Sequence, residues 1–96
     1  MDYFSAQAKL AGRVERKIGN NRYLEQTGEG TICLRLHHTY IVVFYANGDI
    51  KLNSGGWRTV TTKAAINEVS PRRVNQVKGE WYVGDREFFD GMIIHA

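Results

Sequence analysis

Asn53-Ser-Gly-Gly-Trp-Arg-Thr-Val-Thr-Thr62 separates two parts of the chain that differ in the periodicity of their apolar residues. Up to Leu52 the apolar residues alternate as in β-strands, and from about Thr62 they recur with the spacing of an α-helix. The run itself is polar, is broken by glycines and contains one large aromatic residue, Trp57. We therefore expect a long exposed connection between a strand and a helix, the kind of segment on which small proteins place a binding surface.

The residues before this run predict an antiparallel meander. Tyr40 to Tyr45 is apolar on both faces, so we expect a central strand whose second face is covered by a helix or a loop. Asn47-Gly48 predicts a tight hairpin turn because both residues tolerate a positive φ, and the returning strand continues from Ile50 to Leu52. Two further strands precede the central one: Arg22 to Gln26, and Thr31 to Leu36 with Ile32, Leu34 and Leu36 facing the core.

The N-terminal segment, residues 1–19, predicts an amphipathic helix of about four turns from about Phe4 to Ile18. Its start has two candidate caps, Asp2 and Ser5, and Gly12 within it costs about 1 kcal/mol relative to alanine. The apolar stripe consists of Leu10, Ala11, Val14 and Ile18. The polar side is either a solvated face or a nucleic-acid-binding face, and it holds Lys9, Arg13, Arg16 and Lys17.

A second, shorter helix is expected after the Asn53–Thr62 run, at about residues 62–69. Ala65, Ile66 and Val69 have helical spacing, and either Thr61 or Thr62 can serve as the N-cap. Ser70-Pro71 ends it, because proline cannot continue a helix.

A second hairpin and a last strand complete the predicted sheet. Arg73 to Val77 and Trp81 to Val83 flank a tight turn at Lys78-Gly79-Glu80, and Met92 to Ile94 is expected to form a short strand or a packed tail. No internal repeat or linker interrupts the sequence, so we expect one domain, residues 1–96. The predicted class is α+β: an N-terminal helix, an antiparallel meander sheet of about five or six strands, and a short second helix packed on the sheet.

The composition is that of a globular protein, with 43% hydrophobic residues and a net charge of +3. Basic residues predominate as far as Gly79 and acidic ones from Glu80 onward, an asymmetry that permits a phosphate-facing surface. A single cysteine, Cys33, excludes an internal disulfide framework and indicates a reducing compartment. No signal-peptide pattern follows Met1 and no apolar run reaches the length of a membrane span, so we expect a cytoplasmic protein without a membrane partner.

The titratable residues do not form a recognisable catalytic or metal-binding pattern. His37 and His38 are adjacent, so in an extended backbone their side chains point to opposite faces. Cys33 has no cationic pocket or orienting third group in the sequence pattern. Ser54-Gly55-Gly56 lacks the spacing of a phosphate-binding P-loop. We therefore expect no enzyme activity, no cofactor and no metal ion.

The start of the second helix is the candidate binding region. Its first backbone N–H groups have no partner within the helix, and the side chains around them can hold a phosphate or a carboxylate of a partner: Arg58, Thr59, Thr61, Thr62 and Lys63. Trp57 has two interpretations, since it can contact a partner or fold back as a lid on the sheet.

Several motifs resemble a family of small proteins encoded by bacteriophages and prophages. The most specific is the run from Leu52 to Asn67 that includes Gly-Gly-Trp-Arg-Thr. The resemblance also includes the Leu34–His38 strand end, the Ala46-Asn-Gly-Asp hairpin, Lys78-Gly-Glu-Trp-Tyr-Val83 and Phe88-Phe-Asp-Gly91. It covers roughly residues 18–91 and leaves the N-terminal helix outside. The resemblance implies a phage origin and an accessory role in the host cytoplasm, without naming catalytic residues.

Two hypotheses follow from this resemblance and the candidate region. In the first, the protein is a non-enzymatic binding module that contacts a host protein or nucleoprotein complex, as an anti-CRISPR or other anti-defence inhibitor would. Trp57 and Arg58 would be its anchors, because tryptophan and arginine are enriched at interface hot spots. In the second, the protein binds nucleic acid directly, with the basic side of the first helix assisting a surface made of Arg58, Lys63, Arg72 and Arg73.

Overall fold

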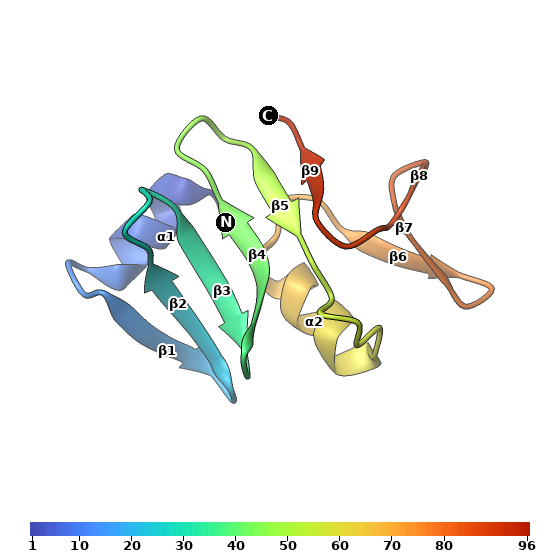
Figure 1. The fold of residues 1–96 in the computed structure, drawn as a ribbon, viewed down its shortest axis with the longest axis horizontal. Helices are drawn as coiled ribbons and strands as arrows, with labels where there is room; N and C mark the ends of the chain where they lie inside the picture. Colours follow the sequence, from blue (N-terminus) through green and yellow to red (C-terminus); the bar gives the residue numbers. More distant parts are fainter.

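Two antiparallel sheets and two helices make up the computed structural model, which describes residues 1–96 (Figure 1). The larger sheet has six strands in the order β1-β2-β3-β4-β5-β9. They are β1 (Glu15–Gly19), β2 (Arg22–Gln26), β3 (Ile32–Leu36), β4 (Thr39–Phe44), β5 (Ile50–Leu52) and β9 (Met92–Ile94). The smaller sheet consists of β6 (Val74–Val77), β7 (Glu80–Val83) and β8 (Arg86–Glu87). The helices are α1 (Tyr3–Leu10) and α2 (Val60–Val69), and the predicted α+β class is confirmed.

One face of the six-stranded sheet forms the floor of the core. The register places a row of apolar side chains directly opposite one another across five strands, and all are fully buried: Leu24, Leu34, Val42, Leu52 and Met92. Both helices contribute to the same cluster, α1 through Ala6 and Leu10 and α2 through Ala65, Ile66 and Val69. Strict alternation along short strands therefore produces this core, as the sequence pattern predicts.

The second face of the central strand has no helix or loop over it, so that prediction is wrong (Figure 1). The pairing of β3 with β4 shifts register between Leu34 and Arg35, which makes Ile41 the extra residue of a β-bulge. Ile41 and Val42 consequently both belong to the core cluster. The bulge therefore explains why apolar and polar residues do not alternate along this strand, although only one face of the strand packs on the core. On the outer face Cys33 and Val43 are shielded only by their neighbours, and Ile93 is exposed.

The first helix is shorter than predicted and is followed by a strand. Asp2 is its N-cap, and the Asp2 carboxylate accepts a hydrogen bond from the Ser5 N–H at 2.8 Å. The chain leaves the helix at Ala11 and Gly12, both in the left-handed region with φ of 51° and 81°. The prediction of a helix to Ile18 is therefore wrong, and residues 15–19 form the edge strand β1. The basic residues assigned to one helix face lie instead on α1, the following turn and β1.

The second helix begins two residues earlier than expected. Thr59, not Thr61 or Thr62, is its N-cap, and the Thr59 hydroxyl accepts a hydrogen bond from the Thr62 N–H at 3.2 Å. Ser70 is the C-cap, as predicted. The helix packs against β4 and β6 and so connects the two sheets.

The second hairpin forms as predicted but belongs to its own small sheet. Trp81 and Val83 of β7 are buried, and the Trp81 ring meets Phe88 edge to face with centroids 5.2 Å apart. On β6 only Val74 is buried. Met92–Ile94 is a strand that pairs with β5, which makes β9 the edge strand of the larger sheet on the side of the small sheet (Figure 1).

Candidate functional site

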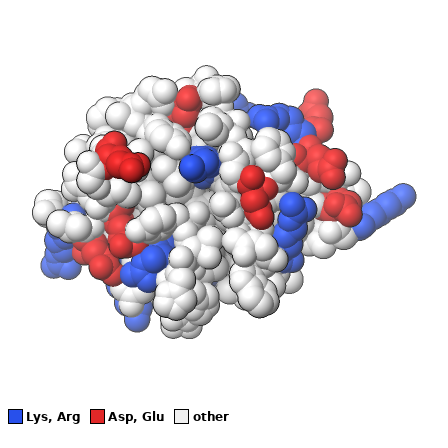
Figure 2. Space-filling model, viewed as in Figure 1, with Lys and Arg blue, Asp and Glu red and all other residues white.

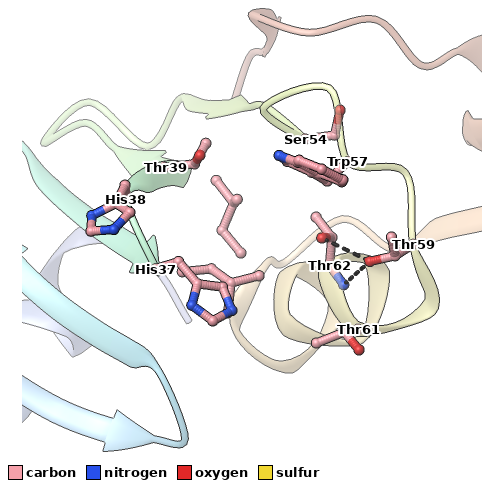
Figure 3. Close-up of a pocket in the computed structure, with 10 residues that line it drawn as sticks. His37, His38, Thr39, Ser54, Trp57, Thr59, Thr61 and Thr62 are labelled. Atoms are coloured by element: carbon pink, nitrogen blue, oxygen red, sulfur yellow. Dashed lines mark hydrogen bonds between the residues drawn. The ribbon is translucent and has the colours of Figure 1, made fainter.

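A half-open pocket of about 510 Å³ lies where the β3–β4 turn, the segment after β5 and the first turn of α2 meet (Figure 3). Residues 53–59, named here the Trp57 corner, form one of its walls. Four of the predicted binding residues line the pocket: Trp57, Thr59, Thr61 and Thr62. Leu36, His37, His38, Thr39, Ile41 and Ser54 complete the lining. The lining contains no carboxylate, lysine or arginine.

Asp90, which precedes β9, fixes the backbone of the Trp57 corner. The Ser54 N–H and hydroxyl both donate hydrogen bonds to the Asp90 carboxylate, at 2.8 and 2.7 Å. Ser54 is itself buried, and the Gly55 N–H donates to the Asn53 side-chain oxygen at 2.6 Å. Partial burial acts to raise the pKa of Asp90, but the Ser54 hydrogen bonds and the Arg58 charge outweigh it, so the pKa lies below its ordinary value.

Gly55 allows the corner to approach the β3–β4 turn closely. Its φ is +65°, and a Cβ atom at this position would lie 2.7 Å from the Thr39 hydroxyl oxygen. Only glycine fits here, for two reasons. A positive φ is unfavourable for residues with a Cβ atom, and the Cβ atom would clash with the Thr39 side chain. The close approach is what brings Trp57 and the histidine turn to the same pocket.

Trp57 stands at the rim of the pocket and is 70% exposed (Figure 3). The interpretation in which it folds onto the sheet as a lid is therefore wrong. The neighbouring Val60, at the first position of α2, is 77% exposed. Val60 does not line this pocket but a separate cleft, which it shares with Lys63 and Arg73.

His37 and His38 line the pocket, although the sequence pattern did not indicate them as binding residues. They form the two-residue link between β3 and β4, and His37 has a φ of 55°, which is uncommon for a residue with a side chain. Their nearness to the Trp57 corner could have been found from the meander itself. In consecutive antiparallel strands, the β3–β4 link and the end of β5 lie at the same end of the sheet.

Arg58 and Lys63 do not line this pocket. The Arg58 guanidinium lies over the Phe88 ring, 5.2 Å from its centroid, and donates a long hydrogen bond of 3.5 Å to the Phe88 carbonyl. The Lys63 ammonium donates to the Gln76 side-chain oxygen at 2.8 Å. The two cations therefore hold the small sheet against α2 and the corner.

Arg72 and Arg73 line a different cleft, of about 530 Å³, together with Arg86 and His95. Lys63 shares a further cleft with Arg73 but not with Arg72, and Arg58 lines neither cleft. The four residues expected to form one nucleic-acid surface are thus only partly brought together. On the face in Figure 2, lysine and arginine side chains are interspersed with aspartate and glutamate, and no broad basic patch is seen.

The protein family is shown by comparison with family models. The model described as Kyanoviridae Gp96 protein matches residues 5–95. The chain belongs to this family. The expected phage origin is thereby confirmed. The matched region includes most of α1, although the sequence motifs had suggested a resemblance that begins only near residue 18. No curated protein and no solved structure matches the chain.

No three His, Cys, Asp or Glu side chains are grouped so that they could hold a metal ion. Burial raises the pKa of the Cys33 thiol, which favours the less nucleophilic protonated form. Neither helix has the length and apolar character needed to cross a membrane.

Proposed function

We propose that this phage protein is a non-enzymatic binding module that contacts a host protein through the Trp57 corner. The observation that supports this most directly is the 70% exposure of Trp57 on a backbone that Asp90 and Gly55 hold in place. Tryptophan is enriched among interface hot spots because one side chain buries a large area on contact. A corner that is already ordered loses little conformational entropy when it binds.

The pocket beside Trp57 favours a protein partner that inserts one side chain. Its threonine hydroxyls and histidine rings offer hydrogen bonds, while Leu36 and Ile41 supply apolar contact. In this proposal Arg58 supports the corner, because its guanidinium lies over the Phe88 ring and donates to the Phe88 carbonyl.

The role that fits a phage-encoded module of this kind is the inhibition of a host complex. Membership of a phage protein family supports an accessory role, and an exposed indole beside a pocket without lysine, arginine or carboxylate suits a protein surface. We propose a cytoplasmic host complex as the partner, with anti-phage defence, including CRISPR nucleases, as the leading class.

Direct nucleic-acid binding through one surface of Arg58, Lys63, Arg72 and Arg73 has less support. Such a surface needs its cations to face one backbone, whereas Arg58 lies over Phe88 and Lys63 is bonded with Gln76. Arg73 shares one cleft with Arg72 and another with Lys63, whereas Arg58 lines neither.

Substitution of Trp57 tests the protein-binding proposal. A partner is first captured from host lysate with the native protein, with and without nuclease treatment, and its affinity is then measured for purified components. Trp57→Ala should weaken binding by at least about 2 kcal/mol and leave the melting temperature nearly unchanged, because the side chain is exposed. Phe4→Ala is the matched control, since Phe4 is an aromatic residue that is 63% exposed on α1, away from the pocket.

Two results would contradict the proposal. One is a captured partner that binds Trp57→Ala as tightly as the native protein. The other is capture that disappears after nuclease treatment, which would show that nucleic acid links the two proteins.

A further inference from the structure

The cleft lined by Arg72, Arg73, Arg86 and His95, named here the basic cleft, concentrates positive charge between the two sheets. Arg72 and Arg73 come from the link between α2 and β6, Arg86 comes from β8, and His95 follows β9. Segments far apart in the sequence therefore supply its cationic walls. None of the three arginines is engaged in a salt bridge.

The backbone that presents Arg72 and Arg73 is held on both sides. The Ser70 hydroxyl donates a hydrogen bond to the Arg72 carbonyl at 2.6 Å and accepts one from the Arg72 N–H at 3.1 Å. Beyond Arg73, the Asn67 side chain of α2 pairs with both backbone groups of Val74, at 2.7 and 2.9 Å. These two clamps fix the direction of the link, while the arginine side chains themselves form no recorded hydrogen bond.

The opposite wall is anchored in the same way. Arg86 pairs with Val83 in the small sheet, and its guanidinium donates one hydrogen bond to the Ile93 carbonyl at 3.2 Å. Because a guanidinium has five N–H donors, most remain available for a ligand. The His95 ring lies 3.0 Å from the Asp49 carboxylate, which positions it at the cleft.

The acidic groups near the basic cleft limit how far its charge extends. The lining itself contains no aspartate or glutamate. Asp49 contacts His95, and Asp85 and Glu87 flank Arg86 in the sequence. The positive potential is therefore strongest inside the cleft and is opposed just outside it, which favours a compact anion over an extended charged surface.

We propose that the basic cleft binds a phosphate group of a single nucleic-acid strand. Arginine guanidinium groups match phosphate oxygens with paired hydrogen bonds, and two walls of such groups can hold one phosphate between them. A flexible single strand can place a phosphate in a recess, whereas a duplex needs a wider basic surface than the three arginines and one histidine of this cleft supply. This site is separate from the Trp57 corner and does not depend on its proposed partner.

The test measures the binding of a fluorescently labelled single-stranded 12-mer by anisotropy at low salt. The native protein should bind it, and Arg72→Ala combined with Arg86→Ala should weaken binding at least about tenfold, as expected from the loss of charge-assisted phosphate contacts. Arg72→Ala alone should also weaken binding, and its side chain makes no bond within the protein, so a folding defect cannot explain the loss. Arg13→Ala removes an exposed arginine outside the cleft and should change the affinity little.

The competing phosphate sources are separated in the same assay. Unlabelled strand should displace the probe at far lower concentration than inorganic phosphate or a mononucleotide. Equal competition by the mononucleotide would overturn the assignment to a strand, and stronger competition by a duplex of the same length would overturn the choice of a single strand. No binding at low salt, or equal losses for Arg13→Ala and Arg72→Ala, would overturn the site itself.

Discussion

The Trp57 corner and the basic cleft are both preformed, but they differ in the groups that they offer to a ligand. The corner presents an exposed indole beside a pocket of threonine hydroxyls and histidine rings, and the pocket lining has no lysine, arginine or carboxylate. The cleft presents three arginines without salt bridges. Side chains fix the backbone at both, through Asp90 at the corner and through Ser70 and Asn67 at the cleft.

This difference indicates two independent binding modes on one small scaffold. Contact at the corner would gain free energy mainly from burying apolar area, which responds weakly to salt. Contact at the cleft would gain it from charge, which salt screens. The two sites can therefore be separated by substitution and by ionic strength.

The largest expected effect comes from filling the close contact between the corner and the β3–β4 turn. Gly55→Ala should lower the free energy of unfolding by about 2–4 kcal/mol, because the left-handed backbone is strained and the new Cβ meets Thr39. Urea denaturation measures this loss. Gly56→Ala is the control, since its φ is +83° but no atom lies within 4 Å of the new Cβ, and it should cost only about 1–2 kcal/mol. Equal costs would mean that the contact with Thr39 is unimportant.

A smaller effect is expected when the Asp90 clamp is weakened. Asp90→Asn should destabilise the protein by about 1–2 kcal/mol near neutral pH, because charge-assisted hydrogen bonds to Ser54 are lost. Asp85→Asn is the control, since Asp85 is exposed and has no recorded hydrogen bond. Unfolding free energies measured by denaturant titration check both variants, and Asp90→Asn should leave binding at the basic cleft unaffected.

The pH dependence of the same variant sharpens this test. The pKa of Asp90 lies below its ordinary value of 3.8, so the carboxylate stabilises the folded state fully above that value and progressively less as the pH falls through the folded pKa. The difference in unfolding free energy between native protein and Asp90→Asn should therefore shrink when the pH is lowered from about 6 to below about 4. A difference that stays constant over this range would contradict the assigned role of the charge.

The smallest expected effect is the response of each site to salt. For one or two phosphates in the basic cleft, raising the salt from 50 to 200 mM should weaken strand binding by about 3- to 7-fold, from a slope of about −0.7 per phosphate. The affinity of a partner for the Trp57 corner should change by less than about 2-fold, because the lining of the neighbouring pocket lacks lysine and arginine. The same salt slope at both sites would remove the distinction between them.

The strands and turns could be predicted from the sequence because their signals are local. Alternation identified β2, β3, β5 and β7, and Asn47-Gly48 and the Lys78-Gly79 turn marked both hairpins. The N-terminal segment was mistaken for one long helix because spacing over Leu10 to Ile18 fits a helical stripe. Alanine favours a helix, so nothing at Ala11 predicts the left-handed conformation that ends α1. The strand β1 forms because it pairs with β2, and this pairing is not visible in its own residues.

The chain's own residues were sufficient to indicate an α+β fold, its hairpins and the importance of the segment around Trp57, since period, turn chemistry and capping act over a few neighbours. Only the folded chain could show that Trp57 is exposed and that Arg58 lies over Phe88 while Arg72 joins Arg86. These relations depend on the strand register, on the close approach at Gly55 and on the hydrogen bonds of Asp90. Each connects residues that are distant in sequence, and local patterns contain no information about such distances.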